Sequence, residues 1–197
     1  MGKMFAALGA HVTQADQIAH DLMRPGQPVY EEVVRHFGRD ILSSDATIDR
    51  KKLADTVFGT PEHPSKRVEE LNQIVHPAVG QYQNRWMNEV AREYPGAVIL
   101  VEAALIYEAN LQSQFDRMIV VTCPFEARVR RWMARTHVDE ASARAELKRR
   151  AVAQWPEEKK IQAADYRIDN SGNAEETERQ VREIMERLLA GRANPSG

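Results

Sequence analysis

Short apolar runs alternate along the chain with longer segments whose apolar residues recur every three or four positions. Four runs are candidate strands, at residues 10–13, 97–101, 118–121 and 166–169, of which the last is the least apolar. The first follows Gly9, a residue type that commonly ends a helix, and the second follows the turn signal Pro95-Gly96. Continuous apolar runs are typical of parallel strands that are covered on both faces.

The segments between these runs show helical periodicity. One stripe is formed by Val29, Val33, Val34 and Phe37 and ends at Gly38. A second has Asn173 as its expected N-cap and comprises Val181, Ile184, Met185, Leu188 and Leu189. Pro124 suits the first position of a further helix, with Glu126 in the same first turn.

Strands that alternate with helices predict a doubly wound α/β sheet. The stretch from 16 to 94 contains no convincing strand, so we expect a helical insertion between two strands. Insertions of this kind usually hold a substrate. Doubly wound sheets bind ligands at the carboxyl ends of their strands, so the residues that follow each apolar run are the most informative.

Composition and charge exclude several classes of protein. Apolar residues make up 43% and charged residues 28% of the 197 positions, which fits a packed domain rather than a disordered chain. A formal charge of -2 argues against a general binder of nucleic acid or membrane surfaces. Cys123 is the single cysteine, and the sequence shows neither a secretory signal nor a membrane-spanning apolar run. We expect a cytoplasmic globular protein, a monomer without nucleic-acid or membrane partners.

Two carboxylates at strand ends are candidates for chemistry. Asp16 follows the first strand and precedes a helix, where it could act as a general base or simply cap the helix. Glu102 ends the second strand. A lone buried carboxylate is costly unless it is paired, so Glu102 is either a functional group or the partner of an arginine elsewhere.

Arginines form a second signal. Arg128, Arg131 and Arg135 share one helix face, and a basic run follows at 148–150. Guanidinium groups match phosphate oxygens with two hydrogen bonds, which suits a polyphosphate site. The alternative is a solvated face that pairs with Glu140 and Glu146.

Two further motifs have ordinary structural explanations. His76-Pro77 is expected to end one helix and start the next, because proline restricts the residue before it. Asn170-Ser171-Gly172 is expected to form an Asx-type turn, although its amide could also contact a base edge.

Taken in order, these pieces resemble the dephospho-CoA kinase family. The resemblance runs from Phe5 to about Val181, and no single motif in it is specific, whereas the ordered set is. It includes Asp16 with Ile18 and Ala19, Ile48-Asp49-Arg50, His76-Pro77, Val101-Glu102 through Tyr107-Glu108, Arg131, Arg135, Gln154, Pro156, Lys160, and Ile168 through Gly172. The chain departs from the family's pattern at Gln14, Ala104 and Arg128.

The resemblance implies a role for each candidate residue. Asp16 would be the base for the ribose 3′-hydroxyl, and Arg131 and Arg135 would close over the phosphates of ATP. Arg50, His76 and Glu102 would bind dephospho-CoA, and Asn170 would lie near the adenine of ATP. ATP would be accompanied by Mg²⁺, and no residue of this chain is assigned as a metal ligand.

One part of the family pattern is missing from the sequence. The family begins with a strand and a phosphate loop that ends Gly-Lys-Ser/Thr, whereas no G-x-x-x-x-G-K-[ST] motif occurs in the 197 residues. The resemblance implies that Gly2-Lys3 aligns within the helix that follows the loop. We expect either that Met1 is an internal codon of a complete kinase or that the chain is an inactive truncation, and the intact remaining motifs favour the first.

The expected organisation is a single domain of P-loop kinase type over 1–190, with a flexible tail at 191–197. Within it, 16–94 would be the helical CoA-binding insertion and 128–160 the lid region. Two alternative functions stay open: a non-catalytic CoA-binding remnant, and another small-molecule or nucleotide kinase.

Overall fold

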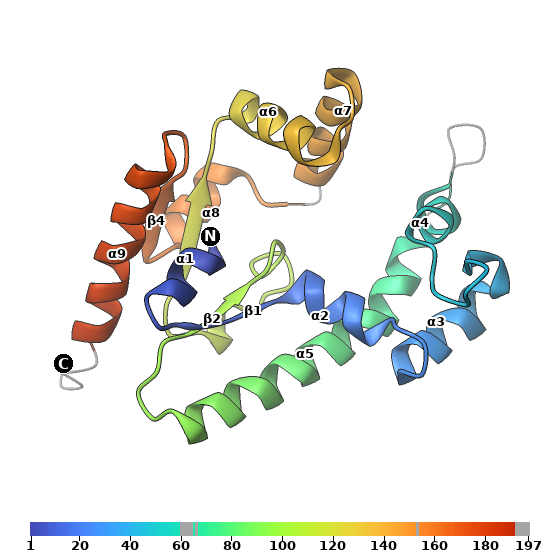
Figure 1. The fold of residues 1–197 in the computed structure, drawn as a ribbon, viewed down its shortest axis with the longest axis horizontal. Coiled ribbons are helices and arrows are strands. Elements are labelled where there is room, and N and C mark those ends of the chain that lie inside the picture. The colour runs from blue at the N-terminus through green and yellow to red at the C-terminus, as the bar shows by residue number, and fades with distance from the viewer. Residues whose placement is uncertain (60–64, 66, 153, 192–197) are drawn as a thin grey trace. The chain divides into compact units, whose positions relative to one another are not determined.

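The structure is a computed structural model that describes residues 1–59, 65, 67–152 and 154–191 (Figure 1). Its residues group into two compact units. The N-terminal unit comprises Ala10–Glu102 together with Gly2, and the C-terminal unit comprises Lys3–Gly9 and Ala103–Gly197 together with Met1. Each unit is described by itself.

The N-terminal unit contains one pair of parallel strands. Strand β1 (His11–Gln14) pairs with β2 (Ile99–Glu102), and the register places Gln14 opposite Glu102. The chain between them is helical, as predicted for 16–94. It forms α2 (Ala15–Leu22), α3 (Pro28–Phe37), the 3-10 turn η1 (Arg39–Ile41), α4 (Arg50–Phe58) and α5 (Val68–Glu93).

Apolar faces of these helices form the core of the N-terminal unit. The predicted stripe on α3 is confirmed, since Val29, Val33 and Phe37 are buried and Gly38 ends the helix with a φ of 88°. A residue with a side chain would be strained there, because positive φ favours glycine. The buried cluster consists of Ile18, Val29, Val33, Phe37, Ile41, Leu53, Val57, Val75 and Val79.

Helix α5 corrects one expectation from the sequence. It continues through His76-Pro77 without a break, so the predicted helix boundary at that motif is wrong. Proline inside a helix costs about 3 kcal/mol, because it removes a hydrogen bond and crowds the preceding turn. Val75 and Val79 are buried on either side of Pro77, and this packing offsets the cost.

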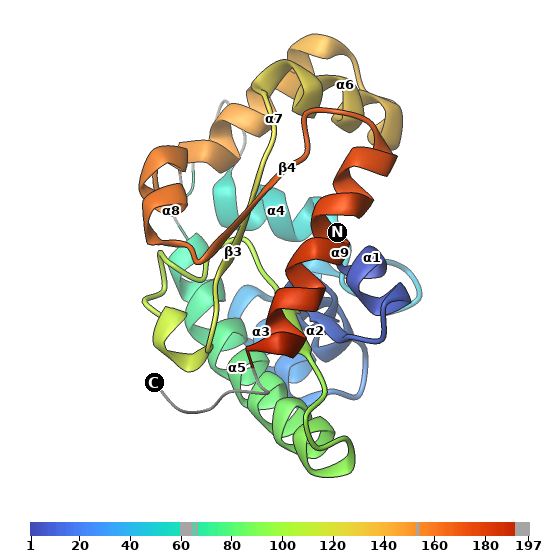
Figure 2. The same ribbon diagram turned by 90° about the vertical axis from the view of Figure 1, so that its left-hand side faces the viewer.

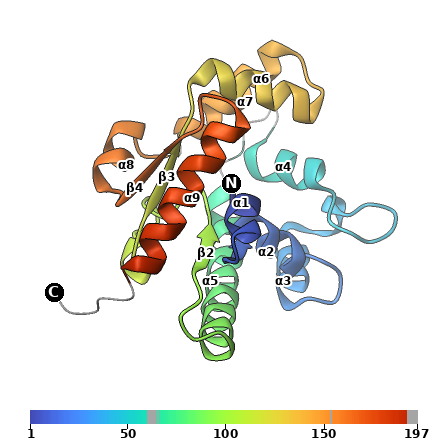
Figure 3. The same ribbon diagram turned by 60° about the vertical axis from the view of Figure 1, so that its left-hand side comes forward.

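The C-terminal unit contains the second pair of parallel strands. Strand β3 (Ile119–Thr122) pairs with β4 (Tyr166–Asp169), with Ile119 opposite Tyr166. Figures 2 and 3 show helix α9 (Ala174–Ala190) lying along this pair. The remaining elements are α1 (Gly2–Ala7), the 3-10 turn η2 (Gln112–Gln114), α6 (Phe125–Thr136), α7 (Glu140–Val152) and α8 (Glu157–Ala163).

The sequence predicted several helix ends in the C-terminal unit. Asn173 is the N-cap of α9, and its side chain accepts a hydrogen bond from the Glu176 amide at 2.8 Å. Pro124 is the N-cap of α6 and not its first helical residue, so that prediction was wrong by one position. Leu189 is 48% exposed, so the buried stripe of α9 ends before it. Of the predicted flexible tail, residues 192–197 lie outside the described residues.

The predicted α/β class with parallel strands is confirmed. Both units connect their parallel strands through helices, and each strand has one strand neighbour among the residues that the structure describes. Within the same residues, no helix combines the length and apolar character needed to cross a lipid bilayer.

Candidate active site

Asp16 lies in the first turn of α2, directly after β1. The N-cap of this helix is Gln14, and no side chain caps it, so the interpretation of Asp16 as a cap is wrong. Its carboxylate is exposed and makes no hydrogen bond or ion pair with any described residue. A free carboxylate at the end of a parallel strand is available to accept a proton, and the role of base stays a prediction.

Glu102 ends β2 at the same edge of the N-terminal unit, because the parallel register pairs it with Gln14. Its Oε2 accepts hydrogen bonds from the Gly2 amide at 3.1 Å and from Gln14 Nε2 at 3.3 Å. Glu102 was expected to be buried or to pair with an arginine. Both expectations are wrong, because Glu102 is exposed and its hydrogen-bond donors, Gly2 and Gln14, are neutral. Water and these two donors solvate the charge, so no countercharge is needed.

Gly2 lies too close to Glu102 for a side chain to fit at this position. A Cβ atom added to Gly2 would lie 2.7 Å from Glu102 Oε2 and 2.8 Å from Val12 Cγ1. Glycine at this position therefore allows the backbone amide to approach the carboxylate.

Arg50 and His76 are both exposed in the N-terminal unit. Arg50 is the first residue of α4, whose N-cap Asp49 accepts from the amides of Lys51 and Lys52 at 2.8 and 3.1 Å. His76 lies in the interior of α5. Neither side chain has a polar partner among the described residues, and no contact joins them. Their assignment to substrate binding stays a prediction.

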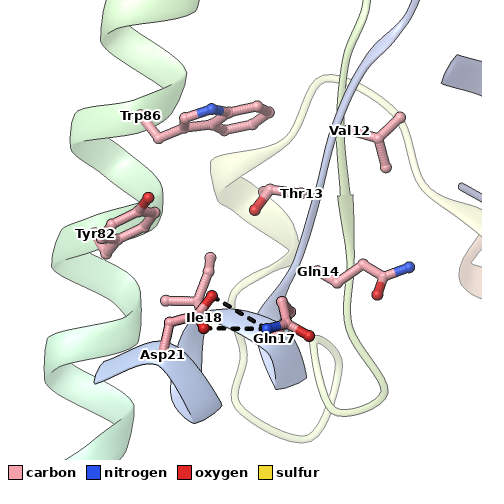
Figure 4. Close-up of a pocket in the computed structure, with 8 residues that line it drawn as sticks. All are labelled: Val12, Thr13, Gln14, Gln17, Ile18, Asp21, Tyr82 and Trp86. Carbon is pink, nitrogen blue, oxygen red and sulfur yellow. Dashed lines mark hydrogen bonds between the residues drawn. The ribbon is translucent and has the colours of Figure 1, made fainter. Parts of the chain in front are cut away.

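A pocket of about 290 Å³ opens between β1, α2 and α5, next to the helix that carries Asp16 (Figure 4). Strand β1 contributes residues 12–14, and α5 contributes Tyr82 and Trp86. Helix α2 contributes Gln17, Ile18 and Asp21. The sequence analysis did not identify the two aromatic residues, because their spacing of four positions is equally typical of a helix face buried in a core.

Arg131 and Asn170 are brought together in the C-terminal unit. Arg131 Nη1 donates to the Asn170 carbonyl at 2.8 Å, and Nη2 donates to the Gly172 carbonyl at 3.2 Å. The guanidinium therefore holds the turn after β4 against α6. Two backbone carbonyls occupy part of its donor set, while the guanidinium itself stays exposed.

The turn after β4 is an Asx-type turn, but Asp169 makes it instead of Asn170. Asp169 Oδ1 accepts from the Ser171 amide at 2.9 Å, and the hydrogen bonds from Ser171 lower the pKa of this carboxyl group. The Asn170 Oδ1 instead accepts from the Thr177 hydroxyl at 3.3 Å. Its contact with a nucleotide base stays a prediction.

Arg135 is exposed and stacks on an aromatic ring. Its guanidinium carbon lies 4.8 Å from the centre of the Trp132 ring, and that of Arg150 lies 4.6 Å from the same ring. The sequence offered a solvated face paired with Glu140 and Glu146 as an alternative. For Arg128, Arg131 and Arg135 the pairing is wrong, although their side chains are exposed, whereas Arg149 and Arg150 of the basic run do pair with Glu146. Glu140 pairs with Arg144.

Ion pairs lie within helix α7 and between α7 and α6. Arg144 binds Glu126 through both of its Nη atoms, at 2.8 and 2.6 Å, and Glu140 at 2.7 Å. Hydrogen bonds from Arg149 and then Arg150 lower the pKa of Glu146 to about 2. Ala143 is the buried residue of α7, whereas Val152 is 88% exposed. This sparse apolar packing matches the expectation for the lid region, whose movement stays a prediction.

A partly buried ion pair in the C-terminal unit was not predicted from the sequence. Lys160 Nζ lies 2.9 Å from Glu108 Oε1, and the two side chains are 12% and 15% exposed. Glu108 also accepts from the Trp155 amide, and Lys160 also donates to Gln154 Oε1 at 2.9 Å. Burial opposes ionisation, yet these hydrogen bonds keep the pKa of Glu108 below its ordinary value. The resemblance singles out Lys160, but nothing in its charged run, 157–160, indicates a pairing with Glu108.

We expect Lys160→Met to lower the free energy of unfolding by about 2 kcal/mol, because it leaves a partly buried carboxylate without its countercharge. Lys159→Met is the matched control: Lys159 lies over the Trp155 ring and has no buried carboxylate partner among the described residues. Urea denaturation of both variants measures the difference. Equal, small losses in the two variants would contradict a stabilising role for the buried pair.

The family model described as dephospho-CoA kinase matches residues 1–176. A dephospho-CoA kinase of Aquifex aeolicus is 38% identical over 188 residues, which cover 95% of this chain and 90% of that protein. A dephospho-CoA kinase of Geobacillus kaustophilus is 38% identical over 182 residues, covering 92% of this chain and 86% of that protein.

Solved structures show the same fold. The crystal structure of TT1252 from Thermus thermophilus superposes with a TM-score of 0.71 at 28% identity, covering 94% of this chain and 88% of that one. The dephospho-CoA kinase from Campylobacter jejuni superposes with a TM-score of 0.65 at 23% identity, covering 97% and 92%.

Proposed function

The chain belongs to the dephospho-CoA kinase family, and from this membership we propose that it phosphorylates the ribose 3′-hydroxyl of dephospho-CoA with ATP to give coenzyme A. The observation that carries the proposal is the match to this family over residues 1–176. The free carboxylate of Asp16 at the end of β1 supports it, because transfer to a hydroxyl needs a proton acceptor.

Asp16 takes the proton of the 3′-hydroxyl as that oxygen attacks the γ-phosphorus of ATP. The bond between the γ-phosphorus and the β–γ bridging oxygen breaks, and ADP leaves with the electron pair. Arg131 and Arg135 offset the negative charge of the transferring group. Arg50, His76 and Glu102 bind dephospho-CoA, and Asn170 lies near the adenine of ATP.

Mg²⁺ enters with ATP in this proposal. Among the residues that the structure describes, no group of three or more His, Cys, Asp or Glu side chains could hold a metal ion. Mg²⁺ at phosphoryl-transfer sites is commonly held by substrate phosphates and water with only one or two protein carboxylates. An ion that arrives on ATP is compatible with such a donor set.

A second function is favoured by one observation, the absence of a G-x-x-x-x-G-K-[ST] motif from the 197 residues. That loop supplies the amides and the lysine that bind the phosphates of a nucleotide. Without these groups the chain would bind dephospho-CoA without transferring phosphate. A different nucleotide kinase is the third alternative.

We therefore expect the 197-residue chain to bind ATP with a Kd weaker than ~10 µM, a binding free energy of about -7 kcal/mol. Isothermal titration calorimetry with ATP and Mg²⁺ measures this directly. Tighter binding would show that other residues of the chain replace the phosphate loop.

The kinase proposal is tested with a chimera, called here the loop chimera, in which a strand and a G-x-x-x-x-G-K-S loop are joined ahead of Met1. Release of ADP is measured with dephospho-CoA, AMP and adenosine as acceptors. We expect turnover with dephospho-CoA and little with the other two. Preference for AMP or adenosine would favour the alternative of another nucleotide kinase.

A further inference from the structure

The pocket between β1, α2 and α5 has an aromatic wall. Tyr82 and Trp86 are four residues apart on α5, so they lie on the same face of that helix. Figure 4 shows the Trp86 ring directed across the pocket toward Thr13 of β1. Tyr82 is 41% exposed and Trp86 is partly exposed, and neither ring stacks on another described side chain. Two large ring surfaces are thus left open on one side of the pocket.

The opposite side of the pocket offers neutral polar groups. Gln17 Nε2 donates to both carboxylate oxygens of Asp21, at 3.1 and 3.2 Å. The Oε1 atom of Gln17 keeps its capacity to accept a hydrogen bond, and Thr13 contributes a hydroxyl group. Amide and hydroxyl groups beside an aromatic surface suit a flat heterocycle with donors and acceptors on its edge.

The charges of the lining residues do not favour the pyrophosphate of dephospho-CoA in this pocket. No lysine or arginine lines it, and its charged group is the carboxylate of Asp21. Asp21 is itself bound by Arg24 at 2.8 Å, which lies outside the lining. A pyrophosphate would find no cationic partner in the lining, so the candidates are the adenine ring and the uncharged pantetheine arm. The flat aromatic wall favours the ring.

The pocket lies beside the part of α2 that carries Asp16, the proposed base. Gln17 lines the pocket, and Asp16 precedes it in the first turn of α2. The ribose of a nucleotide is bonded directly to its base. A base held against Gln17 therefore leaves its ribose near the start of this helix.

We propose that this pocket binds the adenine ring of dephospho-CoA, with Trp86 and Tyr82 as its stacking surface and Gln17 and Thr13 facing the ring's polar edge. The inference rests on the proposed function and adds residues that determine which substrate is accepted. It assigns the nucleobase to the N-terminal unit and leaves the pantetheine arm outside the pocket.

The test is titration of the 197-residue chain with dephospho-CoA by calorimetry. Loss of a base–aromatic stack weakens binding by roughly 5- to 140-fold, and we expect Trp86→Ala to fall in this range. Trp86→Phe, which keeps a ring, should stay within a few-fold of the unchanged chain. Tyr82→Ala is a second variant at an exposed position, and Trp155→Phe is the control outside the pocket. Unchanged affinity in both Trp86→Ala and Tyr82→Ala would overturn the inference.

Competition separates the two candidate occupants. AMP should displace dephospho-CoA from the unchanged chain and lose this ability in Trp86→Ala, whereas pantetheine should not compete. Displacement by pantetheine but not by AMP would overturn the inference and leave the kinase proposal intact. Absence of any dephospho-CoA binding would overturn the inference, and the kinase proposal itself fails only if the loop chimera also shows no turnover.

Discussion

Replacing Asp16 with asparagine in the loop chimera lowers kcat by ~10²-fold or more and leaves the KM for dephospho-CoA nearly unchanged. Asparagine keeps the size and hydrogen-bonding oxygen of the side chain but cannot accept the proton of the 3′-hydroxyl. Asp16 is exposed and has no described partner, so the change breaks no structural contact. Steady-state kinetics with dephospho-CoA varied at saturating ATP measures both constants.

Glu31→Gln is the matched control for this variant. Glu31 is an exposed carboxylate in the first turn of α3, as Asp16 is in α2, so both changes remove a similar interaction with a helix dipole. The control should leave kcat unchanged, and thermal unfolding should show similar small shifts in both variants. A kcat within a few-fold of the unmodified chimera for Asp16→Asn would reduce Asp16 to an ordinary helix residue.

Arg135→Ala in the loop chimera is expected to cost about 2–4 kcal/mol of transition-state stabilisation, by analogy with the loss of one donor to a developing anion. The same change should lower the free energy of unfolding by less than about 1 kcal/mol, because its contact with Trp132 is an exposed cation–π interaction. Measuring kcat/KM and urea denaturation on one variant separates the two effects.

Arg130→Ala is the control for Arg135. Arg130 is an exposed arginine of the same helix that lies off the face shared by Arg128, Arg131 and Arg135. We expect it to change neither kinetics nor stability appreciably. The reverse result for Arg135→Ala, a lowered melting temperature with normal kinetics, would assign this side chain to folding and exclude it from the phosphate site.

The sequence predicted the four strands to within one or two residues, together with the helix ends at Gly38 and Asn173, because these depend on local chemistry. The apolar run at 118–121 became β3 with a shift of one residue, and Asn173 caps α9 through its own side chain. Gly38 ends α3 because only glycine adopts a φ of 88° without strain. Each of these signals is contained within a few neighbouring residues.

The errors concern residues whose surroundings are set by packing. Pro77 lies inside α5 because burial of Val75 and Val79 outweighs the local preference of proline. Glu102 is solvated because β2 ends at the surface, which an apolar run cannot indicate. Lys160 and Glu108 are 52 positions apart in the sequence, and the residues around each of them do not indicate its partner.

Some residues of the candidate site could be proposed from the sequence alone, and others could not. Asp16 became a candidate because parallel strands place functional groups at their carboxyl ends, and its role stays a prediction. Arg131 became a candidate from helical spacing, but its contacts with the carbonyls of Asn170 and Gly172 could be seen only in the fold. The stacking surface of Tyr82 and Trp86 was not found, since only the packing of α5 against β1 and α2 leaves these rings on a pocket.

The most direct test of the account identifies the product of the loop chimera. Incubation with dephospho-CoA, ATP and Mg²⁺, followed by phosphorus NMR, reports where the new phosphate is attached. We predict a phosphomonoester on the ribose 3′-oxygen, formed in equal amount with ADP and lost in the Asp16→Asn variant. Hydrolysis of ATP without a new ester, or an ester on any other hydroxyl group, would contradict the proposed kinase function.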